Sequence, residues 1–106
     1  MTGDAIKMST MSWYRLTLNS AQVAAGELQQ RQEAFDEAFG AARAPRTMAL
    51  FQQAREDGGV DLFLTPDCGE HAAELIEEWG CTPCERPSMI GLHLLVGHAE
   101  MTYYMP

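Results

Sequence analysis

Three cysteines and one histidine have spacings that occur in zinc sites: Cys68 and His71 form one pair, and Cys81 and Cys84 form a second. Thiolates and imidazoles are the side chains that bind tetrahedral zinc. However, a helix is expected over residues 67–79, and at ~1.5 Å per residue it would hold His71 and Cys81 about 15 Å apart. Ligands of one zinc ion lie within ~4 Å of one another, so only a broken helix or a second subunit could close such a site. We therefore expect no intramolecular metal site and no cofactor.

The same cysteines could instead act as reactive thiols. Cys-Thr-Pro-Cys at residues 81–84 resembles the Cys-x-Pro-Cys of thioredoxin-like proteins, where a helix that starts at the pair lowers the pKa of the first thiol. Here the pair follows a helix and Pro87 obstructs a second one, so only a reversible disulfide under oxidation stays open. Cys68 lies in the first turn of the expected helix, where the helix dipole favours a thiolate. It is therefore the candidate reactive thiol, and the alternative is an ordinary first-turn residue.

The elements that must position these residues follow from the hydrophobic periodicity. Apolar residues alternate in four segments, which predicts strands, and recur at helical spacing in two others. Strands are expected at residues 12–18, 47–53, 60–65 and 89–96, and helices over about 20 residues after Asn19 and over residues 67–79. Residues 47–57 have helical propensity, but the Asp-Gly-Gly turn at residues 57–59 favours a hairpin and a strand at 47–53. Capping boxes are expected at Asn19 with Gln22 and at Asp67 with Glu70.

The order strand-helix-strand-strand-helix-strand is similar to the ferredoxin-like fold. In that fold, two helices cover one face of a four-stranded antiparallel sheet with the spatial order 4-1-3-2. A chain of 106 residues has room for one core, which buries roughly 65% of the surface of the unfolded chain. We therefore expect a single α+β domain over residues 12–106, preceded by a flexible tail at residues 1–11.

Strand alternation divides the apolar residues between the two faces of the expected sheet. The helix side would carry Tyr14, Leu16, Leu18, Leu62, Leu64, Leu92 and Leu94, and the open side would carry Trp13, Arg15, Phe51, Phe63, His93 and Leu95. Monomers rarely expose an apolar patch beyond a few hundred Å². We therefore expect the open face to be covered by a second copy of the chain or by a ligand.

Four residues of this open face are candidate ligand-binding residues: Trp13, Arg15, Phe63 and His93. A histidine and an arginine among aromatic rings could hold a carboxylate or an oxygenated ring, with the imidazole donating or accepting a proton near neutral pH. The alternative is that both groups form hydrogen bonds across a dimer interface. The sequence identifies no catalytic residue.

The charge balance and the missing motifs exclude several classes of function. Seven Lys and Arg residues against fifteen Asp and Glu residues give a net charge of −8, which disfavours nucleic acid and anionic membranes as partners. The motifs of P-loop, dinucleotide-binding, α/β-hydrolase and zincin proteins are absent. The longest apolar run, residues 89–97, is far shorter than the ~20 residues of a spanning helix. Because residues 1–11 contain no export signal, a cytoplasmic protein is expected.

A pattern found in small bacterial proteins of this size resembles three stretches of the chain: Leu-Phe-Leu-Thr-Pro at residues 62–66, Cys-Glu-Arg-Pro at 84–87, and Leu-Leu-Val-Gly-His-Ala at 94–99. The resemblance implies no activity. The leading interpretation is a small acidic binding or interaction module that forms homodimers through the open sheet face. The alternatives are a dimeric α/β-barrel-like enzyme or small-molecule-binding protein with a pocket near His93 and Arg15, and a zinc or thiol site at Cys68, Cys81 and Cys84.

Overall fold

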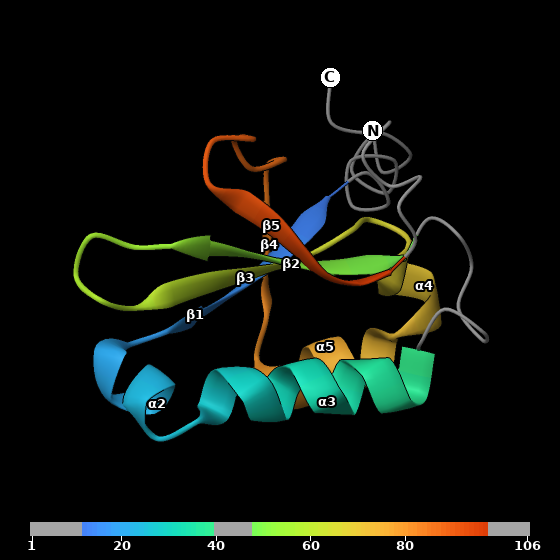
Figure 1. Ribbon diagram of the computed structural model, residues 1–106. Coiled ribbons are helices and arrows are strands. Elements are labelled where there is room, and N and C mark those ends of the chain that lie inside the picture. Colours follow the sequence, from blue (N-terminus) through green and yellow to red (C-terminus); the bar gives the residue numbers. More distant parts are fainter. Residues whose placement is uncertain (1–11, 40–47, 98–106) are drawn as a thin grey trace.

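The structure is a computed structural model, and it describes residues 12–39 and 48–97. These residues form an α+β arrangement of one antiparallel sheet and four helices. In chain order the elements are β1 (Trp13–Leu18), α2 (Ser20–Ala24), α3 (Glu27–Phe39), β2 (Ala49–Ala54), β3 (Val60–Leu64), α4 (Cys68–His71), α5 (Ala73–Trp79), β4 (Thr82–Cys84) and β5 (Leu92–Gly97). Helices α2, α3 and α5 lie on one side of the sheet (Figure 1). The tail expected at residues 1–11 lies outside the described residues.

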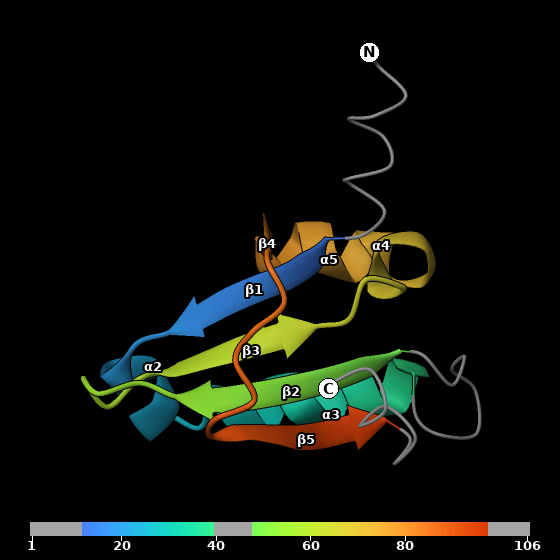
Figure 2. The ribbon, with the colours of Figure 1, turned by 90° about the horizontal axis from the view of Figure 1, so that it is seen from above.

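Within the described residues, the sheet has five strands in the order β4-β1-β3-β2-β5, and every neighbouring pair is antiparallel (Figure 2). The expected number of four strands is therefore wrong. The strand expected at residues 89–96 exists as β5, but it pairs with β2 and lies at the far edge from β1. The place beside β1 is taken by β4. No strand is expected there from the sequence, because three residues are too few to show an alternating pattern.

Both helices expected from the sequence are divided in two. Asn19 begins α2 with the expected capping box: its side chain accepts from the Gln22 backbone N–H, and the Gln22 side chain accepts from the Asn19 N–H, both at 2.8 Å. Gly26 then follows α2 with φ of 86°, a conformation that glycine adopts without strain, and turns the chain into α3. Ala72 separates α4 from α5 with φ of −131°. The Asp67 side chain makes no capping hydrogen bond, so the second expected capping box is wrong.

The helix side of the sheet packs against α3 and α5 and forms the larger hydrophobic core. Five strand residues expected on this side lie in the core or against it: Tyr14, Leu16, Leu18, Leu62 and Leu64. Their orientation is therefore confirmed. Phe35 of α3 is fully buried among them. Arg31 of α3 lies over the ring of Trp79 of α5, with its guanidinium carbon 5.1 Å from the ring centroid, so a cation–π contact also joins the two helices.

The opposite face of the sheet carries a second buried cluster. Trp13, Phe51 and Phe63 pack there with Ala49, and the three aromatic side chains are only 5%, 3% and 5% exposed. The rings of Trp13 and Phe51 are tilted against each other, with their centroids 5.9 Å apart. The aromatic residues expected on the open face are therefore already buried within a single chain, without a second copy or a ligand over them.

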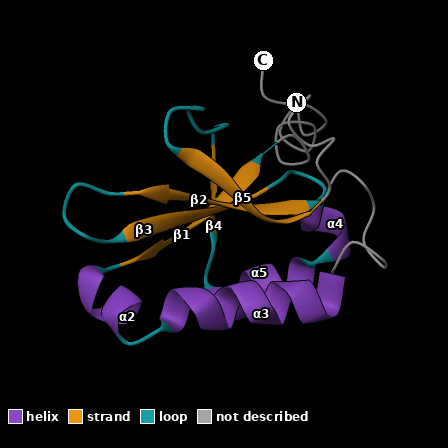
Figure 3. Cartoon of the chain, in the orientation of Figure 1, coloured by secondary structure: helices purple, strands orange, loops and turns teal. Residues whose placement is uncertain are grey.

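The connection between β4 and β5, residues 85–91, crosses this aromatic face (Figures 2 and 3). Gln53 of β2 holds the connection in place, because its Nε2 donates hydrogen bonds to the backbone oxygens of Ser88 at 3.1 Å and Ile90 at 2.8 Å. The connection turns into β5 through a backbone hydrogen bond from Leu92 to Met89 at 3.1 Å. A segment without periodicity thus supplies a cover that strand alternation could not predict.

An irregularity in the pairing of β2 with β5 changes which way the last strand faces. Val96 pairs with Leu50, and Leu94 pairs with Phe51. Leu95 is therefore an extra residue between two consecutive pairs. Such a bulge shifts the alternation of side chains by one position.

As a result, four residues of β5 lie on faces opposite to those expected. Leu92 packs against the aromatic cluster, and Leu94 lies on the same face. His93 pairs with Gln52 on the helix side, and Leu95 packs against the larger core. The faces expected from the sequence for these four residues are wrong.

Candidate functional site

Arg15 and His93, the polar pair of the expected ligand site, lie apart in the sheet. Arg15 belongs to β1 and lies on the aromatic face, opposite Phe63 of β3. His93 belongs to β5 and lies on the other face, with β3 and β2 between the two strands. Trp13 and Phe63 are buried. A single chain therefore does not assemble the expected site from these four residues.

Cys68 begins a helix as expected, but its surroundings disfavour a thiolate. The side chain is fully buried, and its Sγ lies 3.6 Å from the hydroxyl of Thr65. Burial penalises the charged form and raises the pKa of the thiol from 9.0 to about 11. Cys68 is the first residue of α4, which has only four residues, so the dipole of this helix does not offset the penalty. The lowered pKa expected from the sequence is not found.

Cys81 and Cys84 lie on either side of the sheet. Cys81 packs against the larger core, whereas Cys84 packs against the aromatic cluster, and both are free thiols. Burial is the main cause that raises the pKa of Cys81 to about 11 and the pKa of Cys84 above its usual value. In the described part of the chain, no three metal-binding side chains come together. Neither thiol exchange nor zinc binding therefore finds its geometry among these residues.

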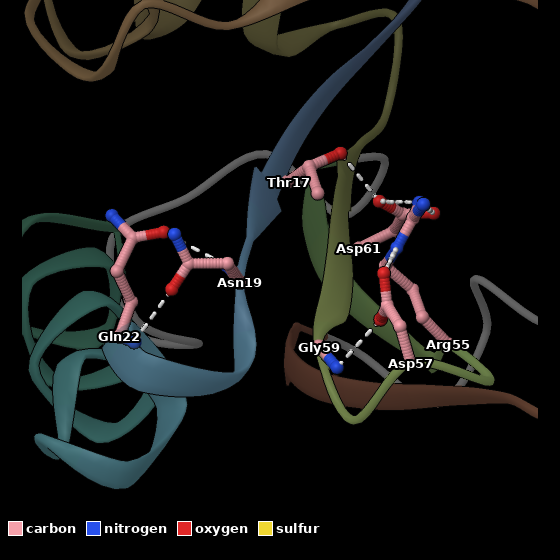
Figure 4. A network of polar contacts seen from close by, with 7 residues as sticks. All are labelled: Thr17, Asn19, Gln22, Arg55, Asp57, Gly59 and Asp61. Atoms are coloured by element: carbon pink, nitrogen blue, oxygen red, sulfur yellow. Dashed lines mark hydrogen bonds and ion pairs between the residues drawn. The ribbon is translucent and has the colours of Figure 1, made fainter.

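A polar network joins the β2–β3 hairpin to β1 and is not expected from the sequence (Figure 4). Asp61 accepts a hydrogen bond from the Thr17 hydroxyl at 2.6 Å, and both of its oxygens lie 3.2 Å from an Arg55 Nη. Asp57 accepts from the Gly59 backbone N–H at 2.9 Å, and this bond is the main cause that lowers the pKa of Asp57. The network thus links the hairpin to β1, and its charged groups already have partners within the chain. Only the strand register brings Thr17 beside Asp61, and no local pattern shows it.

The edge of β5 that faces away from β2 is the best candidate for an interaction surface. Within the described residues β5 has a single neighbour, β2, so the backbone groups along its other side have no partner strand. Three large apolar residues are exposed in β5 or just before it: Met89 at 49%, Ile90 at 85% and Leu94 at 36%. In the described chain, a strand edge without a partner strand and exposed apolar side chains therefore occur together.

A groove with a volume of about 530 Å³ lies between β5 and the helices α2 and α3. Its lining includes apolar Val23, Leu28, Leu95 and Val96, and polar Gln29, Gln32, Glu33 and Asp36. Glu33 and Asp36 are exposed, and no basic residue of the described chain lines the groove. The groove thus combines apolar side chains from β5, α2 and α3 with two carboxylates from α3.

No protein family, curated protein or solved structure matches this chain. Over residues 12–39 and 48–97, none of the helices is long and apolar enough to cross a membrane. The geometry of β5 and of the groove beside it therefore carries the functional inference.

Proposed function

We propose that the protein is an interaction module that binds an extended segment of a partner protein along the edge of β5. The observation that carries this proposal is the combination of exposed apolar side chains with a strand edge that no other strand of the described residues covers. An added strand would form hydrogen bonds with the unpaired backbone groups of β5 and place its side chains on both faces of the sheet. This kind of recognition needs no catalytic group.

The two edges of the sheet differ in a way that supports this proposal. Edge strands are commonly protected by short length, proline or charged side chains. The edge strand β4 has three residues and contains Pro83, which cannot donate a backbone hydrogen bond. β5 has six residues with the sequence Leu-His-Leu-Leu-Val-Gly, without proline or a lysine or carboxylate side chain. Apart from the bulge at Leu95, β5 has none of these protections, and its edge is the one that we expect a partner to cover.

The residues before β5 add an ordered apolar surface to this edge. Ile90 is the most exposed large apolar residue of the described chain. Its backbone is held by Gln53, and its N–H also donates to the Ser88 hydroxyl at 3.2 Å. An apolar side chain on an anchored backbone costs less entropy to bury than one on a loose loop.

β5 adds a fifth strand, beside β2, to the other four strands of the sheet. The order of the other four strands, β4-β1-β3-β2, is that of a ferredoxin-like sheet. We propose that the fold is a ferredoxin-like sheet to which β5 is added beside β2. In this interpretation the interaction surface lies on the added strand.

The homodimer expected from the sequence stays a prediction, and β5 offers a better surface for it than the buried aromatic face. However, two copies that paired through β5 around a twofold axis would bring their acidic grooves near each other. The net charge of −8 on each chain opposes such an approach. We therefore propose a different protein as the partner. An enzyme with a pocket near His93 and Arg15 is not proposed, because these residues lie on opposite faces.

The proposal is tested with a peptide of about seven residues, the length of an ordinary strand, with valine and threonine at alternate positions. On titration we expect the backbone amide NMR signals of residues 92–97 to shift and their exchange with solvent to slow, while those of residues 82–84 stay unchanged. Two control peptides carry N-methyl groups on one or the other set of alternate backbone nitrogens. One of them should lose binding, because it cannot donate to β5.

Equal binding of both N-methylated peptides, or no response in residues 92–97, would contradict the proposal. Sedimentation of the protein alone gives a further check. A dimer that protects the same amides without any peptide would assign the edge of β5 to a second copy of the chain and contradict a foreign partner.

A further inference from the structure

We infer further that the bound segment alternates basic and apolar residues, with the basic side chains on the side of α3. This inference rests on the proposed function, because it assigns the chemistry of the segment that β5 would bind. Successive side chains of a strand point to opposite faces of its sheet. In a strand added beside β5, every second side chain would therefore lie on the side of the helices, over the groove between β5 and α3.

Glu33 and Asp36 give this groove its negative charge. They are three residues apart on α3, so their side chains lie on the same face of the helix. The one arginine of α3, Arg31, is engaged elsewhere: its Nη2 lies 2.8 Å from Glu27, and its guanidinium lies over Trp79. No cationic group of the described chain therefore neutralises the two carboxylates of the groove.

The apolar lining of the groove suits the stems of long basic side chains. Leu28, Leu95 and Val96 line it beside the two carboxylates. Lysine and arginine pack their methylene groups on apolar surface while the charged end stays near water or a carboxylate. An acidic side chain in this place would be repelled, and a short neutral one would leave the lining exposed. Shape and charge therefore favour lysine or arginine.

On the aromatic face of the sheet, we expect the side chains of the bound segment to be apolar. Leu94 lies on that face, and the connection that carries Ile90 crosses it. Burying these two exposed side chains against apolar partners removes their surface from water. In an extended segment with alternating basic and apolar residues, the basic side chains would lie over the groove and the apolar side chains would lie against Leu94 and Ile90.

Three peptides of about seven residues test the inference, with valine at alternate positions and lysine, threonine or glutamate between them. Affinity for the wild-type protein is measured by fluorescence anisotropy, and the NMR signals of residues 92–97 report the place of binding. We expect the lysine peptide to bind about fivefold more tightly than the threonine peptide, and the glutamate peptide not to bind. Equal affinities of the lysine and threonine peptides would overturn the inference and leave the proposed function standing. No binding by any peptide would overturn the proposed function itself.

Two double variants test whether the groove is the source of the preference. Glu33→Gln with Asp36→Asn neutralises the groove, whereas Glu77→Gln with Glu78→Gln removes the same charge from exposed positions on α5, under the other half of the sheet (Figure 2). We expect the groove variant to weaken binding of the lysine peptide about fivefold and to leave the threonine peptide unchanged, while the α5 variant loses less than about twofold. Equal losses in the two variants would show a general attraction to an acidic protein and would overturn the inference. All four positions are exposed. Even if a variant does not fold, equal affinities of the lysine and threonine peptides for the wild-type protein would overturn the inference.

Discussion

Burial of the Cys68 thiol predicts that the free energy of unfolding falls as the pH rises above 9. Its pKa is raised from 9.0 to about 11, because the interior penalises the thiolate. In the unfolded chain the thiol keeps its ordinary pKa, so between the two values the unfolded state releases a proton that the folded state retains. The stabilisation is fully present below the unfolded pKa and is lost as the pH rises through the folded pKa.

The size of the loss follows from the difference between the two pKa values. One pKa unit corresponds to ~1.4 kcal/mol, so the thiol lowers the free energy of unfolding by about 1 kcal/mol near pH 10 and by about 3 kcal/mol well above pH 11. Cys81, whose pKa is also raised to about 11, titrates over the same range. The wild-type curve alone therefore does not isolate Cys68, whereas a comparison with Cys68→Ala does, because Cys81 titrates in both proteins.

Urea unfolding of the wild type and of Cys68→Ala, followed by tryptophan fluorescence from about pH 8 to pH 10.5, measures this difference. At the lower pH the variant should be less stable by about 1 kcal/mol, because a small gap replaces the sulfur. As the pH rises, the wild type should lose its advantage and become the less stable protein. Curves that stay parallel over the whole range would refute the raised pKa. Thiol labelling near pH 8 gives a second measurement, in which Cys68 should react more slowly than Cys84, whose burial is only partial.

Two further sets of substitutions test the packing by thermal unfolding. Gly59→Ala should destabilise the protein by more than about 2 kcal/mol, because the new Cβ would lie 2.5 Å from the backbone oxygen of Leu18. Gly80→Ala, where φ is +73° but nothing lies within 4 Å of the new Cβ, should cost only about 1 kcal/mol; equal costs would contradict the close approach at Gly59. Gln52→Met should raise the stability by about 1 kcal/mol, because the Gln52 Oε1 is buried without a hydrogen-bond partner in the described chain. A lower unfolding temperature for this last variant would show that the amide oxygen is satisfied.

The hairpin of β2 and β3 shows how far local signals in the sequence reach. The Asp-Gly-Gly turn predicts this hairpin against the helical propensity of residues 47–57, and the strand expected at residues 47–53 is confirmed by β2 at Ala49–Ala54. Asn19 and Gln22 form their capping box as expected, because both partners lie within one turn of the chain. Gly26 and Ala72, by contrast, interrupt helices whose periodicity continues past them. Local patterns thus locate most elements but not their interruptions.

The candidate site is the part that sequence reasoning predicted least well. The alternation in β5 is regular, yet one extra residue opposite β2 turns His93 away from Arg15 and Leu92 toward the aromatic cluster. The Cys-x-x-Cys at residues 81–84 suggests a thiol pair, but β4 places its two thiols on opposite sides of the sheet. A glutamate and an aspartate on a predicted helix look like an ordinary solvated face. The groove that Glu33 and Asp36 border exists only because β5 lies beside α3.

The sequence by itself determined the class of fold, the inward faces of β1 and β3, and the acidic charge of the chain. These properties depend on residue type and on the two-residue period of a strand, which act locally. The tertiary structure alone decided where β5 pairs, which way it faces, what covers the aromatic residues and how deeply Cys68 is buried. Each of these depends on contacts between segments distant in the chain, and a single bulge or a crossing connection changes them without altering any local pattern.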